Sequence, residues 1–345
     1  MVDLSIGETF ALCWGVTVAM QCLFFCIAFA CRFDKVTDLA GSANFVVIAV
    51  LTLCLDPSIC TTRQAVLTGL VCVARVELGA YLLYRVLKRG KDSRFDALRD
   101  NCPAFFGFWV YQMLWCFIVS APLIYVNAAT TVDPPLGALD YVGWAIGAIG
   151  FVLQVVADAQ KHFFRADPAN AKRVCDVGVW GYSRHPNFCG EVMLWWGVYI
   201  ASCPVFADDW PSHAAGFSTA VSPLFTMWVL TCLSGIPQAE GQWAKRWYDG
   251  GEAQAQYEAY FESTPPLWLF PPSLYRRMPL LLKRVLCIEL PSYRYPSPDS
   301  GELADSLGSG QQALTNGNDS AGIVDVPPTP SSAKAPYELE VAPEV

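Results

Sequence analysis

The sequence has few charged residues. Asp, Glu, Lys and Arg make up 16% of its 345 residues, whereas hydrophobic residues make up 54%. Soluble globular domains carry about 25% charged residues. The deficit excludes an ordinary soluble domain, because several apolar runs approach the roughly 20 residues that span a bilayer as a helix. We therefore predict an integral membrane protein of the all-α class.

Basic patches and metal-binding patterns are also missing. The net charge is −8, and residues 295–345 account for most of it, with eight acids against one base, Lys334. The first 294 residues are nearly neutral and lack the basic footprint of a nucleic-acid-binding protein. The 14 cysteines include no CxxC pair, so neither a zinc site nor a redox dithiol is supported. We predict no metal and no nucleic-acid partner.

Long apolar runs are what the sequence has instead. The first follows the leader MVDLSIGE, which holds no Lys or Arg and is not typical of a cleavable signal peptide. Seven membrane-spanning helices are predicted, at residues 9–31, 43–59, 65–84, 104–126, 139–160, 191–207 and 219–236.

Charge asymmetry between the loops sets the expected orientation. With the N-terminus outside, the segments 32–42, 85–103, 161–190 and everything after 236 lie inside, and they hold 2, 6, 5 and 8 Lys/Arg. The outside loops hold only Arg63. We expect the N-terminus outside and the C-terminus in the cytoplasm.

The chain is expected to divide into a helical membrane domain, residues 1–294, and a disordered acidic tail, residues 295–345. The tail is rich in Pro, Ser, Gly and acids and has few large apolar residues, a composition that cannot build a core. It serves either as a plain tail or as a binding or phosphorylation segment.

The fifth predicted span carries polar residues that lipid does not tolerate. Gln154, Asp158, Lys161 and Arg165 follow one another at spacings of 4, 3 and 4, which places them on one face of a helix. Ionisable residues inside a span are functional candidates. The stripe is either sealed against neighbouring helices or lines the mouth of a cofactor cavity.

The third span holds a second candidate pair. Glu77 and Tyr81 are four residues apart and share a helical face. A buried carboxyl beside a phenol can donate a proton in catalysis, and a structural pair that joins two helices is equally open. Asp38, before the second span, is expected to be an N-terminal cap.

The stretch WGYSRHPNFCGE, residues 180–191, precedes the sixth span. Gly178 and Gly181 allow tight turns, and Pro186 suits the first position of a helix. Free amides at that helix start, together with Arg173, Arg184 and His185, predict an anion site suited to phosphate.

The motif GVWGYSRHPNFCGE, followed by WWG, resembles the signature of the C-terminal domain of the steroid 5α-reductase superfamily, and most closely its broad branch of membrane proteins. The likeness extends to KRGKDSRFDALR, to DAQKHFFRADPANAKR and to SGIPQAEGQWAKRWYDGG, and it covers roughly residues 34–275. Residues 158–275 correspond to the region that carries the cofactor in those reductases.

The resemblance implies a set of cofactor-binding positions. The Asp of the fifth helix and the Arg seven residues later, which help to hold NADPH in the reductases, fall at Asp158 and Arg165. Trp243 stands where the reductases have tyrosine, and Gln154 where they have asparagine. The full implied set is Gln154, Asp158, Arg165, Arg173, Tyr182, Arg184, His185, Asn187, Glu191 and Trp243.

These features predict an NADPH-dependent reductase of a carbon–carbon double bond in a steroid-like or other lipidic substrate, with Glu77 and Tyr81 as catalytic candidates. Family likeness makes the endoplasmic reticulum the expected membrane. The RHPxxxGE text also resembles isoprenylcysteine carboxyl methyltransferases and phospholipid methyltransferases, so an S-adenosylmethionine-dependent methyltransferase is an alternative. A non-catalytic membrane scaffold is the third.

Overall fold

The computed structural model describes residues 4–295, except residues 33, 57–59, 90–94, 96–99, 209 and 249–251. The side chains of residues 34, 89, 242, 243, 246 and 252 are also outside the description. The predicted acidic tail lies outside the described residues, apart from its first position.

Seven helical segments are long and apolar enough to cross a membrane, and the described part of the chain contains no strand. The all-α membrane bundle is therefore confirmed, whereas its orientation stays a prediction. The first six are α1 (Ile6–Ala30), α2 (Thr37–Cys54), α3 (Thr62–Arg89), α4 (Cys102–Ala128), α5 (Ala138–Ala166) and α6 (Pro186–Ala207). The seventh is composite: η6 (Ala214–Ala220), α7 (Val221–Trp228), a π-helical turn η7 (Val229–Leu233) and α8 (Ile236–Ala239).

Local sequence explains several helix starts. Ser5 and Glu8 form a capping box at α1, and the Asn101 side chain accepts a hydrogen bond from the Ala104 amide at α4. Pro186 is the first residue of α6, as predicted. Asp38 is not a cap: the residue at that position of α2 is Val36, and Asp38 lies in the first turn.

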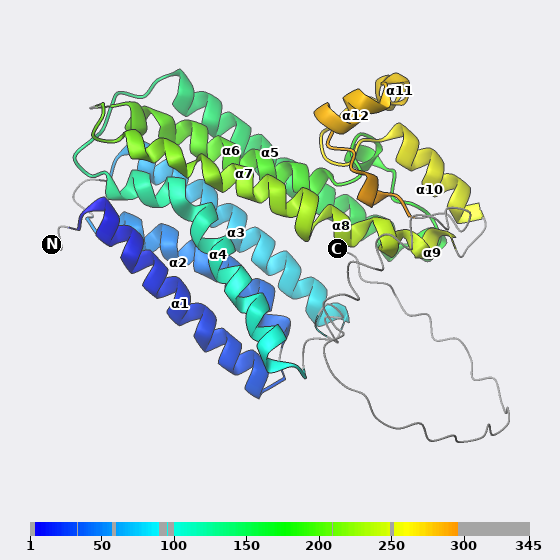
Figure 1. The fold of residues 1–345 in the computed structure, drawn as a ribbon, viewed down its shortest axis with the longest axis horizontal. Coiled ribbons are helices and arrows are strands. Elements are labelled where there is room, and N and C mark those ends of the chain that lie inside the picture. Colours follow the sequence, from blue (N-terminus) through cyan, green and yellow to red (C-terminus); the bar gives the residue numbers. More distant parts are fainter. Residues whose placement is uncertain are drawn as a thin grey trace, which may run out of the picture.

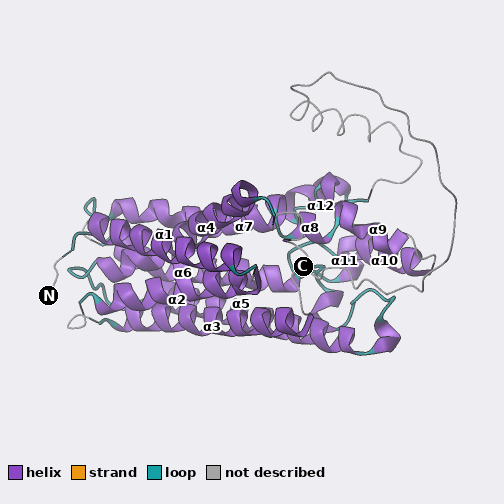
Figure 2. Cartoon of the chain, turned by 90° about the horizontal axis from the view of Figure 1, so that it is seen from below, coloured by secondary structure: helices purple, strands orange, loops and turns teal. Residues whose placement is uncertain are grey.

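The bundle is capped at one end by a helical segment that we call the C-terminal cap, residues 240–295. It lies beyond α8, at the opposite end of the bundle from the N-terminus (Figures 1 and 2). We call this end of the bundle the cap end. The cap contains η8 (Gly241–Ala244), α9 (Lys245–Tyr248), α10 (Glu252–Ser263), α11 (Pro272–Arg277), α12 (Leu280–Leu286) and η9 (Pro291–Tyr293).

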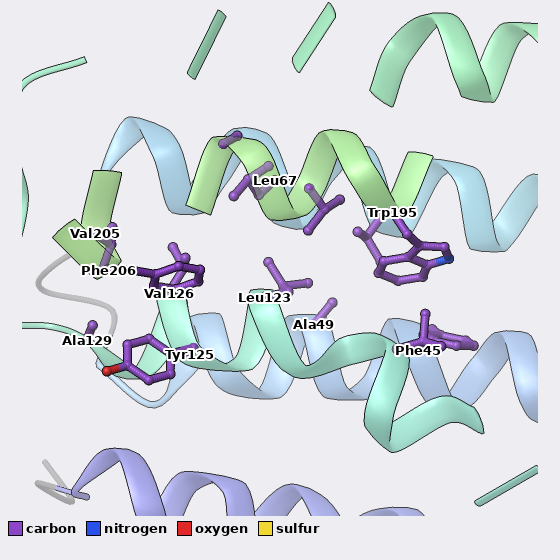
Figure 3. Close-up of a cluster of buried hydrophobic side chains, with 14 of the residues drawn as sticks. Phe45, Ala49, Leu67, Leu123, Tyr125, Val126, Ala129, Trp195, Val205 and Phe206 are labelled. Carbon is purple, nitrogen blue, oxygen red and sulfur yellow. The ribbon is translucent and has the colours of Figure 1, made fainter. Parts of the chain in front are cut away.

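The largest buried apolar cluster joins α2, α3, α4 and α6. Its aromatic members include Phe45 and Trp195, whose ring centroids lie 5.4 Å apart, and Tyr125 and Phe206, 5.1 Å apart in an edge-to-face pair. Figure 3 shows these pairs on either side of Leu123. The cluster fixes the relative positions of the helices that carry the buried polar residues described below.

Helices α5 and α6 lie against each other along their length (Figure 1), with glycines at the points of closest approach. A Cβ atom built on Gly143 would lie 2.6 Å from the carbonyl oxygen of Gly197, and one on Gly150 would lie 2.6 Å from that of Gly190. Small residues let the backbones of membrane helices approach closely. The polar stripe of α5 is therefore held directly against α6.

Replacement of Gly150 by alanine tests this contact. The new methyl group would overlap the Gly190 backbone, and overpacking of this kind costs about 1–3 kcal/mol. We expect a lower apparent unfolding temperature in detergent. The matched control is Gly69→Ala in α3, where an added Cβ meets no atom within 4 Å; an equal fall in both variants would contradict close α5–α6 packing.

Candidate functional site

The polar stripe of α5 meets the start of α6 at the cap end. Asn187 donates a hydrogen bond from Nδ2 to Asp158 Oδ1 at 3.2 Å. Asp158 and Gln154 are buried, 9% and 5% exposed, and Asp158 interacts electrostatically with Lys161 and Arg85. The Oδ1 of Asn187 is buried and accepts no hydrogen bond from the described part of the chain. The structure thus places the predicted residues Gln154, Asp158 and Asn187 close together, and the Asn187 Oδ1 is an acceptor without a partner among the described residues.

Glu77 and Tyr81 face this stripe from α3. The Tyr81 ring packs edge-on against His162 of α5, with ring centroids 6.5 Å apart, and the Glu77 carboxylate acts electrostatically on Asp158. Both side chains are half-buried. The predicted catalytic pair thus lies beside the predicted cofactor residues, whereas the internal cavity described below is lined by other α3 residues.

Arg165, in the last turn of α5, lies close to Arg173, in the loop that follows. Arg165 donates to the backbone oxygens of Asn170 and Arg173, the latter at 2.9 Å, and its guanidinium lies 5.6 Å from the Trp247 ring centre. Arg173 is exposed and donates to Asn170 Oδ1 at 3.2 Å. Arg173 is therefore accessible to solvent at the cap end, and Arg165 is half-buried beside it.

Two further predicted positions lie at the edge of the site. The Tyr182 side chain is 49% exposed, and its backbone oxygen accepts a hydrogen bond from the Phe270 amide of the cap at 2.9 Å. Trp243 belongs to η8, and its side chain lies outside the described residues. Gly178 adopts φ = +55°, so the predicted glycine turn is present.

Arg184 is the centre of a buried network rather than a free anion ligand. Its Nε and Nη2 donate to the two carboxylate oxygens of Glu240, at 2.8 and 3.0 Å, and Nη1 and Nη2 donate to Glu289, both at 3.0 Å. Nη1 also donates to the backbone oxygens of Phe261 and Thr264. The guanidinium is thus fully engaged by the cap, which differs from the phosphate contact expected from the sequence.

His185 joins the same network. Its Nε2 lies 2.8 Å from Glu240 Oε1, and its ring stacks on Phe188 with centroids 5.3 Å apart. Burial lowers the pKa of His185 below its ordinary 6.5. Burial alone would raise the pKa of Glu240, but the Arg184 charge and the bond from His185 outweigh it and hold that pKa below its ordinary value. A neutral His185 therefore donates from Nε2 to an ionised Glu240.

This network makes stability depend on pH in a defined direction. The unfolded chain protonates His185 near pH 6.5, whereas the folded protein resists protonation, so stability falls as the pH drops below about 6.5. We expect a lower apparent unfolding temperature at pH 5.5 than at pH 7.5, and a smaller difference in His185→Gln. The control His162→Gln should keep the dependence of the unaltered protein; loss of the dependence in that variant would contradict the assignment to His185.

A cavity of about 360 Å³ lies between the helices near the cap end. It is lined by α2, α3, α4, the first turn of α6 and the π-helical turn η7, an irregularity frequent at functional sites. Most of the lining is apolar, and its polar members are Asp38, Ser42, Arg75, Tyr111, Gln112, Ser234 and Gln238. The volume is within the range of small-molecule sites.

Arg75 is the functional candidate that sequence reasoning missed. It is 2% exposed inside the membrane span of α3, and its Nη2 lies 2.5 Å from Glu191 Oε2. The Nε–H of Arg75 has no hydrogen-bond partner in the described part of the chain. The signal was present, because an ionisable residue within a span is itself a functional candidate, but the sequence argument selected Glu77 and Tyr81 in this span and not Arg75.

Helix α6 connects the two polar regions. Asn187 and Glu191 are four residues apart, so they lie one turn apart on the same face. Asn187 bonds the α5 stripe, and Glu191 pairs with the cavity residue Arg75. The groups predicted to hold a charged cofactor are therefore one helical turn from a cavity suited to an apolar molecule.

Comparison with known proteins gives a family assignment. A relative from Schizosaccharomyces pombe, described as an uncharacterized protein, is 24% identical over 152 aligned positions, which cover 35% of this chain and 44% of the relative. The match thus spans less than half of that relative's length. No solved structure matches the chain. The model of the family described as protein of unknown function DUF1295 matches residues 24–264, well over half of the chain. The chain therefore belongs to the DUF1295 family.

Proposed function

We propose that this protein is an NADPH-dependent reductase of a carbon–carbon double bond in a lipidic, steroid-like molecule, and that it belongs to the steroid 5α-reductase superfamily. The observation that carries the proposal is the connection made by α6, in which Asn187 contacts Asp158 of the predicted cofactor stripe and Glu191 pairs with the cavity residue Arg75. Hydride transfer from NADPH to a lipidic substrate would need the charged cofactor and the apolar substrate side by side. The endoplasmic reticulum remains the expected membrane.

The side chains at the cap end fit a phosphate-bearing dinucleotide. Lys161, Arg165 and Arg173 supply positive charge for phosphates. The Asn187 Oδ1, which accepts no hydrogen bond from the described residues, is an acceptor for a hydroxyl or amide group. When bound, NADPH would supply a hydride to one carbon of the double bond and be oxidised to NADP⁺, and Glu77 or Tyr81 is the predicted donor of the proton that the other carbon receives.

Arg184 and His185 have a different part in this arrangement. Because their donors are engaged by Glu240 and Glu289, they fasten the cap to the start of α6 and so position Asn187. Asp158 orients the Asn187 amide by accepting from its Nδ2. Both contacts fix the side chain proposed to meet the cofactor.

Ligand binding to the purified protein in mild detergent tests the proposal. We expect NADPH to raise the apparent unfolding temperature and S-adenosylhomocysteine to leave it unchanged. Asp158→Ala should weaken NADPH binding about tenfold, since a lost hydrogen-bond partner near a buried polar group costs about 1–3 kcal/mol. The matched control is Asp176→Ala, a carboxylate that is exposed in the loop before α6.

The alternatives predict other results in the same assay. Stabilisation by S-adenosylhomocysteine alone would contradict the reductase proposal and support a methyltransferase instead. Stabilisation by neither compound, together with undiminished cellular function of Asp158→Ala, would favour a membrane scaffold. Equal loss of NADPH affinity in Asp158→Ala and Asp176→Ala would show that the polar stripe of α5 is not part of the cofactor site.

A further inference from the structure

We propose that α11 and α12 of the cap dock on the surface of the bilayer that the seven spans cross, and that they bind its anionic lipid headgroups. We call residues 272–286, which form these two helices, the docking segment. The partner is a lipid surface that carries negative charge. This inference goes beyond the proposed function and does not depend on it.

The first support is a group of large apolar side chains exposed on α12. Leu281 is 72% exposed and Val285 is 68% exposed, and they lie one turn apart on the same face. The other exposed members are Leu274, Leu280, Leu282 and Leu286. These residues lie in the cap, outside the seven spans. A concentration of exposed apolar side chains outside the spans indicates an interaction surface.

The second support is the charge around these side chains. Residues 264–295 hold five Lys or Arg and a single acid, Glu289, which is buried in the Arg184 network. Arg276, Arg277 and Arg284 of the docking segment are exposed. Leucines beside exposed arginines are typical of a helix that lies in the interface of an anionic membrane. The apolar side chains contact the acyl chains, and the arginines select negatively charged headgroups.

The third support is the length and position of α12. Its seven residues span about 10 Å, far less than the roughly 30 Å of a hydrocarbon core. In both views α12 is closer to the spans along the long axis of the molecule than α9 and α10 are (Figures 1 and 2). This end of the bundle is predicted to face the cytoplasm, the side on which anionic lipids give membranes a negative surface potential.

The docking segment is fastened to the bundle through Glu289. This carboxylate accepts hydrogen bonds from Tyr275 of α11 and from Arg184, and the Glu289 amide donates to the backbone oxygen of Lys283 in α12 at 3.1 Å. The Lys283 side chain donates to the backbone oxygen of Glu262 in α10 at 3.2 Å. The exposed leucines and arginines are therefore presented by a segment whose orientation is fixed, and the same contacts reach the start of α6.

Fluorescence quenching in nanodiscs tests the proposal on the full chain, without NADPH. The fluorescent amino acid Anap replaces Leu281 or, as a control, Ala259, which is exposed on α10. The nanodiscs contain phosphatidylcholine with or without phosphatidylserine, and quenching by lipids with brominated acyl chains is compared with quenching by iodide in the water. We expect brominated lipid to quench the probe at position 281 several-fold more than at position 259, most strongly with phosphatidylserine, and iodide to give the reverse order.

Two other results would overturn the proposal. One is that brominated lipid does not quench the probe at position 281, whether iodide reaches the probe or protein shields it, such as a second copy of the chain or residues 296–345. The other is equal quenching by brominated lipid with and without phosphatidylserine, which would contradict the selection of anionic headgroups.

Variants separate the charge from the apolar face. Arg277→Gln combined with Arg284→Gln should weaken docking on anionic nanodiscs about 25-fold, because each Arg near an anionic surface strengthens binding roughly fivefold. The matched control, Lys172→Gln with Lys245→Gln, removes two exposed cations from other segments and should keep the dependence on phosphatidylserine. Val285→Ser should lower quenching by brominated lipid in both kinds of nanodisc. Limited proteolysis of the cap shows whether each variant is folded, and an unchanged dependence on phosphatidylserine in a folded double arginine variant would contradict the proposal.

Discussion

Replacement of Arg184 by methionine should remove the folded C-terminal cap. The change leaves Glu240 and Glu289, 4% and 6% exposed, as two buried carboxylates without their shared cation. Loss of one partner from a buried ion pair costs about 3–5 kcal/mol, and Arg184 has two such partners. We expect most of the variant protein to aggregate or to be cleaved in the cap during limited proteolysis in detergent.

A compensated variant separates lost charge pairing from lost ligand binding. Arg184→Met combined with Glu240→Gln and Glu289→Gln contains no unpaired carboxylate in this network and should recover part of the protease resistance. Arg173→Met, which removes one exposed hydrogen bond to Asn170, should change neither folding nor the cap. A stable Arg184→Met protein that had lost only its NADPH affinity would contradict this structural role of Arg184 and support the phosphate contact predicted from the sequence.

The seven spans could be predicted because each apolar run is long enough to cross a bilayer. Two of the larger differences in the predicted bounds occur where polar residues begin a helix. The second span starts at Thr37 rather than at residue 43, and the sixth starts at Pro186 rather than at residue 191. Hydropathy passes over these polar first turns, although Asp38 lines the cavity and Asn187 contacts the α5 stripe.

The α5 stripe was predictable because its members share one helix, and helical spacing determines which side chains lie on one face. The partners of Arg184 were not predictable in this way. Glu240 and Glu289 are 56 and 105 residues away from Arg184 in the sequence. Helical periodicity relates residues of one helix and does not predict contacts between separate elements. The anion site at the start of α6 was predicted on the assumption that the N–H donors of Arg184 were unpaired. In the structure, residues of the cap accept hydrogen bonds from all of these donors, so the assumption was wrong.

Two arginines show the limit of counting charges. Arg63 was counted as the base of the outside loops, and Arg75 lies within the third predicted span. In the structure both are almost completely buried, 1% and 2% exposed, and each pairs with a carboxylate on a different helix. Loop charges predict which side of the membrane a segment occupies, but burial decides whether a charge also holds helices together.

Arg63 should therefore be the main structural cation at the end of the bundle opposite the cap. Its Nε and Nη2 donate to the two oxygens of Asp140 at 2.6 and 3.1 Å, and Nη2 also donates to the backbone oxygen of Pro134 at 3.1 Å. Asp140 accepts in addition from the Gly137 amide at the start of α5. The contacts fasten the first turns of α3 and α5 and the loop before α5.

Arg63→Met should lower the apparent unfolding temperature by about 10 °C, because Asp140, 0% exposed, would keep its charge without a cation at a cost of about 3–5 kcal/mol. The measurement is thermal unfolding in detergent. Asp133→Asn is the matched control, since Asp133 meets the same arginine at 3.4 Å with a side chain that is 57% exposed, and exposed pairs contribute about 0–1 kcal/mol. Adding Asp140→Asn to Arg63→Met should recover part of the loss, because the amide oxygen still accepts from Gly137 and carries no charge. An Arg63→Met protein as stable as the Asp133→Asn control would show that this buried pair contributes little to joining α3 and α5.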